Sequence, residues 1–195
     1  MLLDSTWPGW GLWQAGISAG AGLIGALIGG YVTAHSQRVE RRQGRIQQQL
    51  REFYSPLLGM RDEIRAKSEM RTKISGAANA AWQKQVQIHN RFVPDDVKQR
   101  FDKIIDYNNE QLQKDLVPLY HKILELYLNN KWLAEPSTLG FNYELVEFVE
   151  FWNRFYASSL PLEILAELDH TEGKLQPFYK DIQDTFDRLS KELKA

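Results

Sequence analysis

The side chains that most often carry chemistry in proteins are sparse in this chain. It holds four histidines and no cysteine, so neither thiolate catalysis nor a thiolate-ligated metal site can form. His121 and Glu125 are four residues apart, a spacing that puts both on one face of a helix, where they could bind a metal ion together. No second His lies near them in the sequence. We therefore expect an exposed pair and no metal site.

Sequence motifs of catalysis are absent as well. The chain has no nucleophile elbow, no phosphate-binding loop and no zinc spacing. Some all-helical, membrane-anchored proteins of bacterial defence carry a ribonuclease motif of the HEPN type. In this motif an Arg is followed by a His after four to six intervening residues. None of the four histidines here has an Arg at that spacing. We expect no enzymatic activity and no cofactor.

The elements that must position any site begin with the stretch from Trp7 to Ala34. No charged residue lies between Asp4 and His35. A helix from Trp10 to Ala34 would be about 37 Å long at roughly 1.5 Å per residue, enough to cross a hydrocarbon core of about 30 Å. The sequence predicts one transmembrane helix over this stretch.

Two other interpretations of this stretch remain open. A cleavable signal peptide could end at Val32-Thr33-Ala34, but no Lys or Arg precedes the uncharged stretch, which also exceeds the usual apolar region of about 7–15 residues. A buried soluble hairpin is the second alternative, and its glycine content would weaken a helix in water.

Small residues recur along the predicted span in three rows of four-residue spacing. Such rows remove the side-chain ridge and let helix backbones approach closely in a membrane. The sequence therefore predicts self-association, a glycine zipper, through Ser18, Ala21, Gly22, Gly25, Ala26, Gly29 and Gly30.

Basic residues follow the span directly. Residues 35–100 carry 14 Lys and Arg against seven Asp and Glu, whereas residues 101–195 carry ten against 17. By the positive-inside rule the N-terminus lies outside and the C-terminal part in the cytoplasm. We expect contact with anionic lipid headgroups from Arg38, Arg41, Arg42 and Arg45. Nucleic acid could use the same charge, but no recognition motif accompanies it.

The remainder of the chain predicts an all-α fold, because no segment alternates apolar and polar residues for long enough to form a strand. We expect three parts: 1–34 with an outside tail and the span, a basic juxtamembrane helix over 35–75, and a helical bundle over 76–195 that packs with 35–75 as one domain. The juxtamembrane helix carries an apolar seam with a 3.5-residue period, formed by Val39, Ile46, Leu50, Phe53, Leu57, Met60 and Ile64.

Within the bundle, the Gly-Ala-rich segment 76–81 is expected to break the helix. A short helix to about Asn90, a long helix over 94–132 and a loop over 135–140 follow. The aromatic helix over 142–158 is expected at the centre of the core, followed by a short helix over 161–168 and a last helix that Asp169 and Glu172 cap. Pro56, Pro118 and Pro177 either kink helices or begin new ones.

Two segments carry a family resemblance. Phe53-Tyr54-Ser55-Pro56-Leu57-Leu58 and Phe148-Val149-Glu150-Phe151-Trp152 resemble segments of uncharacterised bacterial single-pass, membrane-anchored all-helical proteins. The resemblance covers most of the part after the span. It implies a bacterial inner-membrane setting and no known activity.

Three functional hypotheses follow. The first is a non-enzymatic membrane-anchored protein that self-associates through its span and through the seam of its juxtamembrane helix. It would serve as a scaffold or membrane effector component, with a further protein partner. The second is a homo-oligomeric pore, for example in bacterial defence. The third is an enzyme whose site forms between subunits. Trp82, Trp132, Phe141, Tyr143 and Trp152 could line a ligand pocket, although aromatic residues at helical spacing more often form core.

Overall fold

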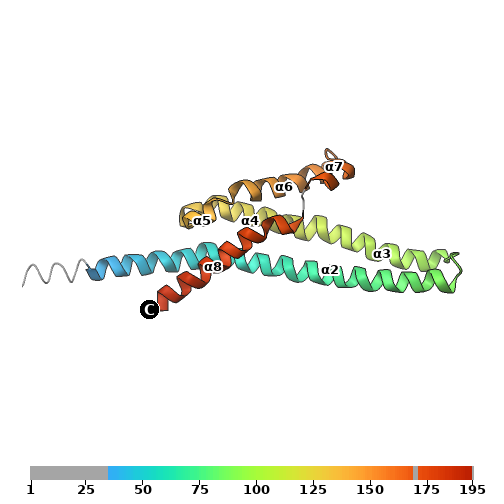
Figure 1. Cartoon of the computed structure of the whole chain (residues 1–195), viewed down its shortest axis with the longest axis horizontal. Helices are drawn as coiled ribbons and strands as arrows, with labels where there is room; N and C mark the ends of the chain where they lie inside the picture. The colour runs from blue at the N-terminus through green and yellow to red at the C-terminus, as the bar shows by residue number, and fades with distance from the viewer. Residues whose placement is uncertain (1–34, 169–170, 195) are drawn as a thin grey trace, which may run out of the picture. The chain divides into compact units, whose positions relative to one another are not determined.

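The computed structural model describes residues 35–168 and 171–194, and its colours follow the chain in Figure 1. The chain forms two compact units, Met1–Ile46 and Gln47–Ala195. Within the described ranges every regular element is a helix and none is a strand. The predicted all-α class is confirmed.

Two antiparallel helical segments form the larger part of the second unit. The first segment begins at Gln47, inside the helix over residues 35–49, and continues through a π-helical turn η1 (Leu50–Tyr54) into α2 (Ser55–Ile88). After a tight turn the chain returns through α3 (Asp95–Gln111), a second π turn η2 (Leu112–Leu116) and α4 (Val117–Asn130). Figure 1 shows α3 lying beside α2, and the two helices are in contact.

The predicted break over residues 76–81 is wrong, because α2 continues through it to Ile88. Alanine is the best helix former, so the alanines of this segment outweigh the cost of about 1 kcal/mol for one glycine. Gly76 has no neighbouring atom near the position of a Cβ. Nothing around Gly76 therefore requires a glycine or the end of a helix at this position.

Each of the three prolines occupies the second residue of a helix. Pro56 follows Ser55 in α2, Pro118 follows Val117 in α4, and Pro177 follows Gln176 in α8 (Gln176–Lys194). Before the first two, the wider π turn lets Ser55 N–H bond Leu50 O, and Val117 N–H bond Leu112 O. A proline cannot donate the next helical hydrogen bond and its ring clashes with the carbonyl four residues back. The π turns remove that conflict without ending the helical path.

Five further elements lie between α4 and α8, and α6 is the only one of them longer than six residues within the described residues. They are η3 (Lys131–Leu133), α5 (Pro136–Leu139), α6 (Asn142–Tyr156), α7 (Leu162–Glu167) and η4 (Glu172–Leu175). The segment predicted as a loop after Trp132 thus contains one helical turn, which Pro136 begins. In Figure 1, α8 crosses α2 obliquely, and it contacts η1, α2 and α5. The predicted cap residue Asp169 lies outside the described residues.

The core gathers around η1, α4 and α8. Its largest fully buried side chains include Phe53, Tyr54, Tyr127, Phe178 and Tyr179. Their rings meet at edge-to-face and tilted angles, with Tyr127 between Phe53 and Phe178, each pair of centroids 6.1 Å apart. Such pairs stabilise a core beyond the apolar area they bury.

The prediction that the aromatic helix is central is wrong. Of α6, only Leu145, Phe148 and Val149 are buried, and Trp152 is half-buried at its margin. The helix contacts α4 on one side and leaves Tyr143 exposed on the other. A wide aromatic stripe indicates that other elements pack on part of a helix. It does not indicate how many elements do so.

The apolar seam predicted after the span is also used differently. Phe53, Leu57 and Ile64 are completely buried within the second unit, and Val39 is exposed. A second chain therefore cannot reach most of the seam. The heptad-like spacing arises because η1 and the start of α2 pack against α4 and α8 of the same chain.

A buried polar network joins η1 to α5 and α8. The Tyr54 hydroxyl accepts a hydrogen bond from Glu135 N–H at 2.9 Å and bonds Thr138 Oγ1 at 3.1 Å. The Thr138 hydroxyl donates to Asp181 Oδ2 at 2.6 Å, so the Tyr54 hydroxyl is the donor to Thr138. Burial raises the pKa of the Tyr54 hydroxyl, so Tyr54 stays a neutral donor.

Gln49 and Arg188 extend this network. The Gln49 amide donates to Leu133 O at 2.8 Å and to Glu135 Oε1 at 3.0 Å, and Arg188 pairs with the other Glu135 oxygen at 3.2 Å. Three stretches that are far apart in the sequence, residues 49–54, 133–138 and 181–188, are thereby joined.

Across the described residues, no helix combines the length and the apolar character that crossing a membrane requires. The predicted span over residues 10–34 falls outside those residues.

Tyr54→Phe tests the network. We expect a loss of about 1–3 kcal/mol in the free energy of unfolding, because Glu135 N–H and Thr138 lose their partner in a buried setting. Chemical denaturation followed by circular dichroism measures it. Tyr143→Phe, which removes an exposed hydroxyl, is the matched control. Equal stability of the two variants would contradict the role given to Tyr54.

Candidate functional site

The hairpin of α2 and α3 is largely exposed. α3 has no buried residue, and α2 has buried residues only at Leu57, Leu58 and Ile64, near its start. Several of its apolar side chains are exposed, namely Met70, Ile74, Ile88, Phe92, Ile105 and Tyr107. So many exposed apolar side chains on one hairpin make it the candidate interaction surface of the described residues.

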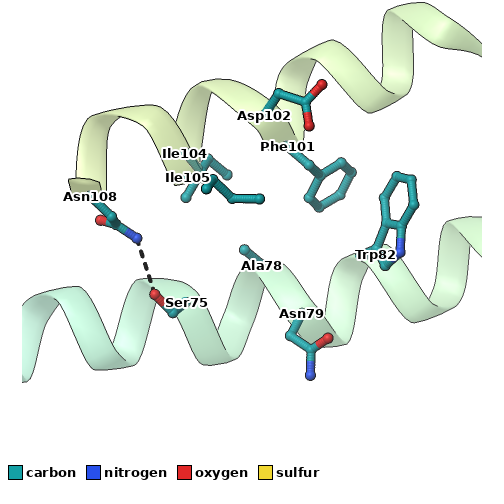
Figure 2. A pocket seen from close by; sticks show the side chains of 9 residues that line it. All are labelled: Ser75, Ala78, Asn79, Trp82, Phe101, Asp102, Ile104, Ile105 and Asn108. Atoms are coloured by element: carbon teal, nitrogen blue, oxygen red, sulfur yellow. Dashed lines mark hydrogen bonds between the residues drawn. The ribbon is translucent and has the colours of Figure 1, made fainter. Parts of the chain in front are cut away.

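A hollow lies between the two helices. It has a volume of about 280 Å³. Figure 2 shows its lining side chains, which are Ser75, Ala78, Asn79, Trp82, Phe101, Asp102, Ile104, Ile105 and Asn108.

Side-chain size explains the hollow. α2 contributes the short side chains of Ser75, Ala78 and Asn79, whereas α3 contributes Ile104 and Ile105. Short side chains opposite bulky ones leave volume that the hairpin does not fill. The lining atoms lack the contacts they would make in a packed core.

An aromatic pair lies at one end of the hollow and a hydrogen bond lies at the other. The rings of Trp82 and Phe101 meet edge to face, with centroids 5.2 Å apart and an interplanar angle of 69°. At the other end Asn108 Nδ2 donates to Ser75 Oγ at 3.0 Å, the dashed line in Figure 2. These two contacts link α2 to α3 on either side of the hollow.

The turn at the tip of the hairpin is strained and presents one side chain outward. Asn90 and Arg91 have φ angles of 45° and 73°. Arg91 N–H bonds Val86 O at 2.9 Å, which closes the end of α2. A positive φ is common for Asn but unusual for a residue as large as Arg. Because of this turn Val93 is buried at 5 % exposure while its neighbour Phe92 is 88 % exposed.

Asp102 beside the hollow and Arg91 beside Phe92 are both exposed. Neither has an ion-pair partner among the described residues. Their neighbours on α3 do pair, Lys98 with Asp95 and Arg100 with Asp96. One unpaired acid therefore lies at the hollow and one unpaired base lies at the tip.

A second cluster of titratable groups lies around Glu172, the first residue of η4. Burial raises the pKa of the Glu172 carboxyl above its usual 4.5, while a hydrogen bond from Tyr120 and the charge of Arg61 act in the opposite direction. Arg61 also lies over the Tyr179 ring, 5.3 Å from its centroid. Burial raises the pKa of both tyrosine hydroxyls, so both stay neutral. We infer that this cluster ties η4 to the core, since it joins Glu172 to Tyr120 on α4 and to Arg61 on α2.

Of the candidate metal pair, His121 makes a contact between two helices. His121 Nε2 lies 2.8 Å from Asn153 Oδ1, which links α4 to α6. No group of three or more His, Asp or Glu side chains that could hold a metal ion occurs in the described part of the chain. His121 and Glu125 are both exposed, as we expected, and His121 is hydrogen-bonded to Asn153.

The other predicted sites divide between described and undescribed residues. Arg38, Arg41, Arg42 and Arg45 lie in the described helix and are exposed. The predicted oligomerisation residues, Ser18, Ala21, Gly22, Gly25, Ala26, Gly29 and Gly30, lie outside the described residues. Of the aromatic set proposed for a pocket, only Trp82 lines the hollow, while Trp132 and Tyr143 are exposed.

Comparison of the chain with protein-family models, with curated proteins and with solved structures finds no match.

Sequence reasoning missed Phe92 and the hollow. A signal for the tip was present, because Asn90 and Pro94 bracket a short turn and an aromatic residue between them must be either buried or presented. The hollow had no such signal. It depends on which face of α2 meets α3, and the wrongly predicted break at residues 76–81 hid that register.

Glu172→Gln tests the electrostatics of the second cluster. Because the pKa of the carboxyl is raised in the fold, its stabilising contribution is complete below about pH 4.5 and is lost as pH rises through the folded-state pKa. We expect the variant to be more stable than the wild type near neutral pH and equally stable in acid. Melting temperature measured against pH checks this, with Glu163→Gln at an exposed position as control. A variant less stable at neutral pH would show that the charged form is the preferred one.

Proposed function

We propose that this chain is a non-enzymatic, membrane-anchored helical protein that self-associates through its Gly-rich span and acts as a scaffold or membrane effector component. It would take no cofactor. Its setting would be the bacterial inner membrane, with the N-terminus outside and the helical bundle in the cytoplasm. Its partners would be the membrane, further copies of itself and another protein.

The observation that carries the proposal is the position of four arginines. Arg38, Arg41, Arg42 and Arg45 follow the spacing i, i+3, i+4, i+7 on a described helix and are all exposed. Residues at that spacing share one helix face. A basic face directly after an uncharged stretch of membrane-spanning length is typical of a juxtamembrane segment. Each such charge near an anionic surface contributes about 1 kcal/mol.

The composition of the stretch before this helix supports anchoring and association together. Residues 10–34 are long enough for one span, and their small residues recur at the spacing that lets helices pack closely in lipid. Lipid tails give helices no hydrophobic reason to associate, so close backbone packing must supply the stability.

The open hairpin supports a scaffold in preference to an enzyme or a pore. Its apolar residues lie on the surface of α2 and α3, where another macromolecule can reach them. A scaffold needs an exposed apolar surface that a partner can bind. A pore would need its functional surface in the span.

Replacing the four arginines tests orientation. In the variant with Arg38, Arg41, Arg42 and Arg45 all changed to Gln, we expect a mixed orientation, because the positive-inside signal is lost. Cytoplasmic and periplasmic reporters fused after Ala195 measure it. The control changes Lys103, Lys114, Lys122 and Lys131 to Gln, since basic residues more than about 20 residues from a span contribute little. A wild-type chain active only with the periplasmic reporter would overturn the topology.

Gly22→Leu and Gly25→Leu test association through the span. Leucine favours the membrane, so insertion should be normal, but its side chain would keep the backbones apart. We expect multimers captured by amine crosslinking in native membranes to be lost. Leu27→Ile, a change of shape outside the small-residue rows, is the control. Unchanged multimers in both glycine variants would leave the span as an anchor alone.

A further inference from the structure

We propose that the hollow between α2 and α3 binds Phe92 of a second copy of this chain, so that two hairpins pair tip to hollow. The contact is reciprocal, because each hairpin carries one tip and one hollow. It differs from association through the span in both its residues and its location in the chain.

The size of the hollow suits one aromatic ring. A cavity of about 150 Å³ lined by apolar side chains already admits benzene, and this one has about 280 Å³. Its lining combines the Trp82 and Phe101 rings with isoleucines from α3. A third ring at this point can meet the aromatic pair edge to face, which is the preferred geometry.

Phe92 is the side chain best placed to enter it. It has the highest exposure, 88 %, among the large apolar side chains of the described residues, and Ile88 beside it is 70 % exposed. The hydrogen bonds and positive φ angles of the turn hold Phe92 outward while Val93 is buried. A ring held outward by a rigid turn loses little conformational entropy on binding.

Phe92 cannot fill the hollow of its own hairpin. From Ala78 in the hollow to Ile88 at the end of α2 there are ten residues, about 15 Å at 1.5 Å each. Two hairpins that run antiparallel and overlap by about that length would bring each Phe92 to the hollow of the other. Such a two-fold arrangement closes on itself.

Charge favours the same partner. Seating Phe92 in the hollow brings Arg91 of one copy toward Asp102 of the other, and neither has an ion-pair partner within the described residues of its own chain. An exposed pair of this kind adds little affinity, but it disfavours wrong registers. The interface is small, so its affinity is low. The pairing therefore rests on the proposed function in one respect, because chains anchored in one membrane meet at a raised effective concentration.

Single cysteines test the pairing in the full chain, which has none of its own. One population carries Phe92→Cys and a size tag, the other carries Ala78→Cys, and both are reconstituted together in membranes and mildly oxidised. We expect a mixed disulfide dimer. The two positions are too far apart within one chain to form that bond, which requires Cα atoms within about 7 Å. Phe92 is exposed and cysteine is small, so neither change threatens the fold.

Ala80→Cys is the matched control for Ala78→Cys, because it lies on the same helix but does not line the hollow. Mixed dimers no more abundant than with Ala80→Cys overturn the proposal. A chain carrying both Phe92→Cys and Ala78→Cys should give closed dimers, and a ladder of larger species would overturn the reciprocal arrangement.

Charge exchange tests the register. Arg91→Glu should slow crosslinking about two- to fivefold, and adding Asp102→Arg should restore the rate. An unrestored rate would contradict the pairing of these two residues across the interface.

Repeating the crosslink with Gly25→Leu in both populations separates the two kinds of association. If the mixed dimer forms while span multimers are lost, the hairpin pairs by itself and the proposal stands. If the span multimers persist and no mixed dimer forms, the hairpin proposal fails and the proposed scaffold function is unaffected.

Discussion

The hydroxyl group of Tyr54 links the parts of the second unit that depend on one another. It accepts a bond from Glu135 N–H before α5, and it bonds Thr138, which in turn bonds Asp181 on α8. Because Tyr54 and Thr138 are completely buried, their hydroxyl groups cannot exchange these partners for water without an energetic cost. The position of α8 across η1 and α2 therefore follows from a polar requirement as much as from apolar packing. Tyr54 is the last residue of η1 and is completely buried.

The same two antiparallel segments change character along their length. α4 buries Leu119, Ile123 and Tyr127, and the start of α2 buries Leu57 and Ile64, whereas α3 buries nothing. The enclosed part includes α8, and the hairpin beyond it has only its own two helices. A two-helix hairpin cannot cover both sides of an apolar stripe. We therefore expect α3 and the end of α2 to open at a lower free energy than the core, unless a partner covers them.

The sequence was sufficient for the fold class and for most helix boundaries. Pro94 with Asp95 began α3, Asn142 began α6, and the 3.6-residue period ran through both. It failed where two preferences competed. Alanine propensity outweighed glycine over residues 76–81, and the heptad-like seam was satisfied inside the chain instead of between chains. The centrality of α6 depended on how many neighbours it has, which its own periodicity does not encode.

Site prediction was limited for a related reason. The arginine face could be read from spacing alone, because it needs only one helix. The hollow needs the register of α2 against α3, and that register follows from Trp82 meeting Phe101 and from Ser75 meeting Asn108, contacts between residues 19 and 33 positions apart. A single sequence contains the side chains for such contacts but not their pairing.

Two separate self-association surfaces on one chain would have a consequence that neither has alone. A reciprocal contact between hairpins closes at two copies, and close packing of spans joins a small number of helices. If both operate and the hairpin joins chains from different span clusters, each cluster is linked to its neighbours, and the assembly extends along the membrane surface. If the hairpin joins chains within one cluster, the two contacts reinforce each other and the assembly stays closed.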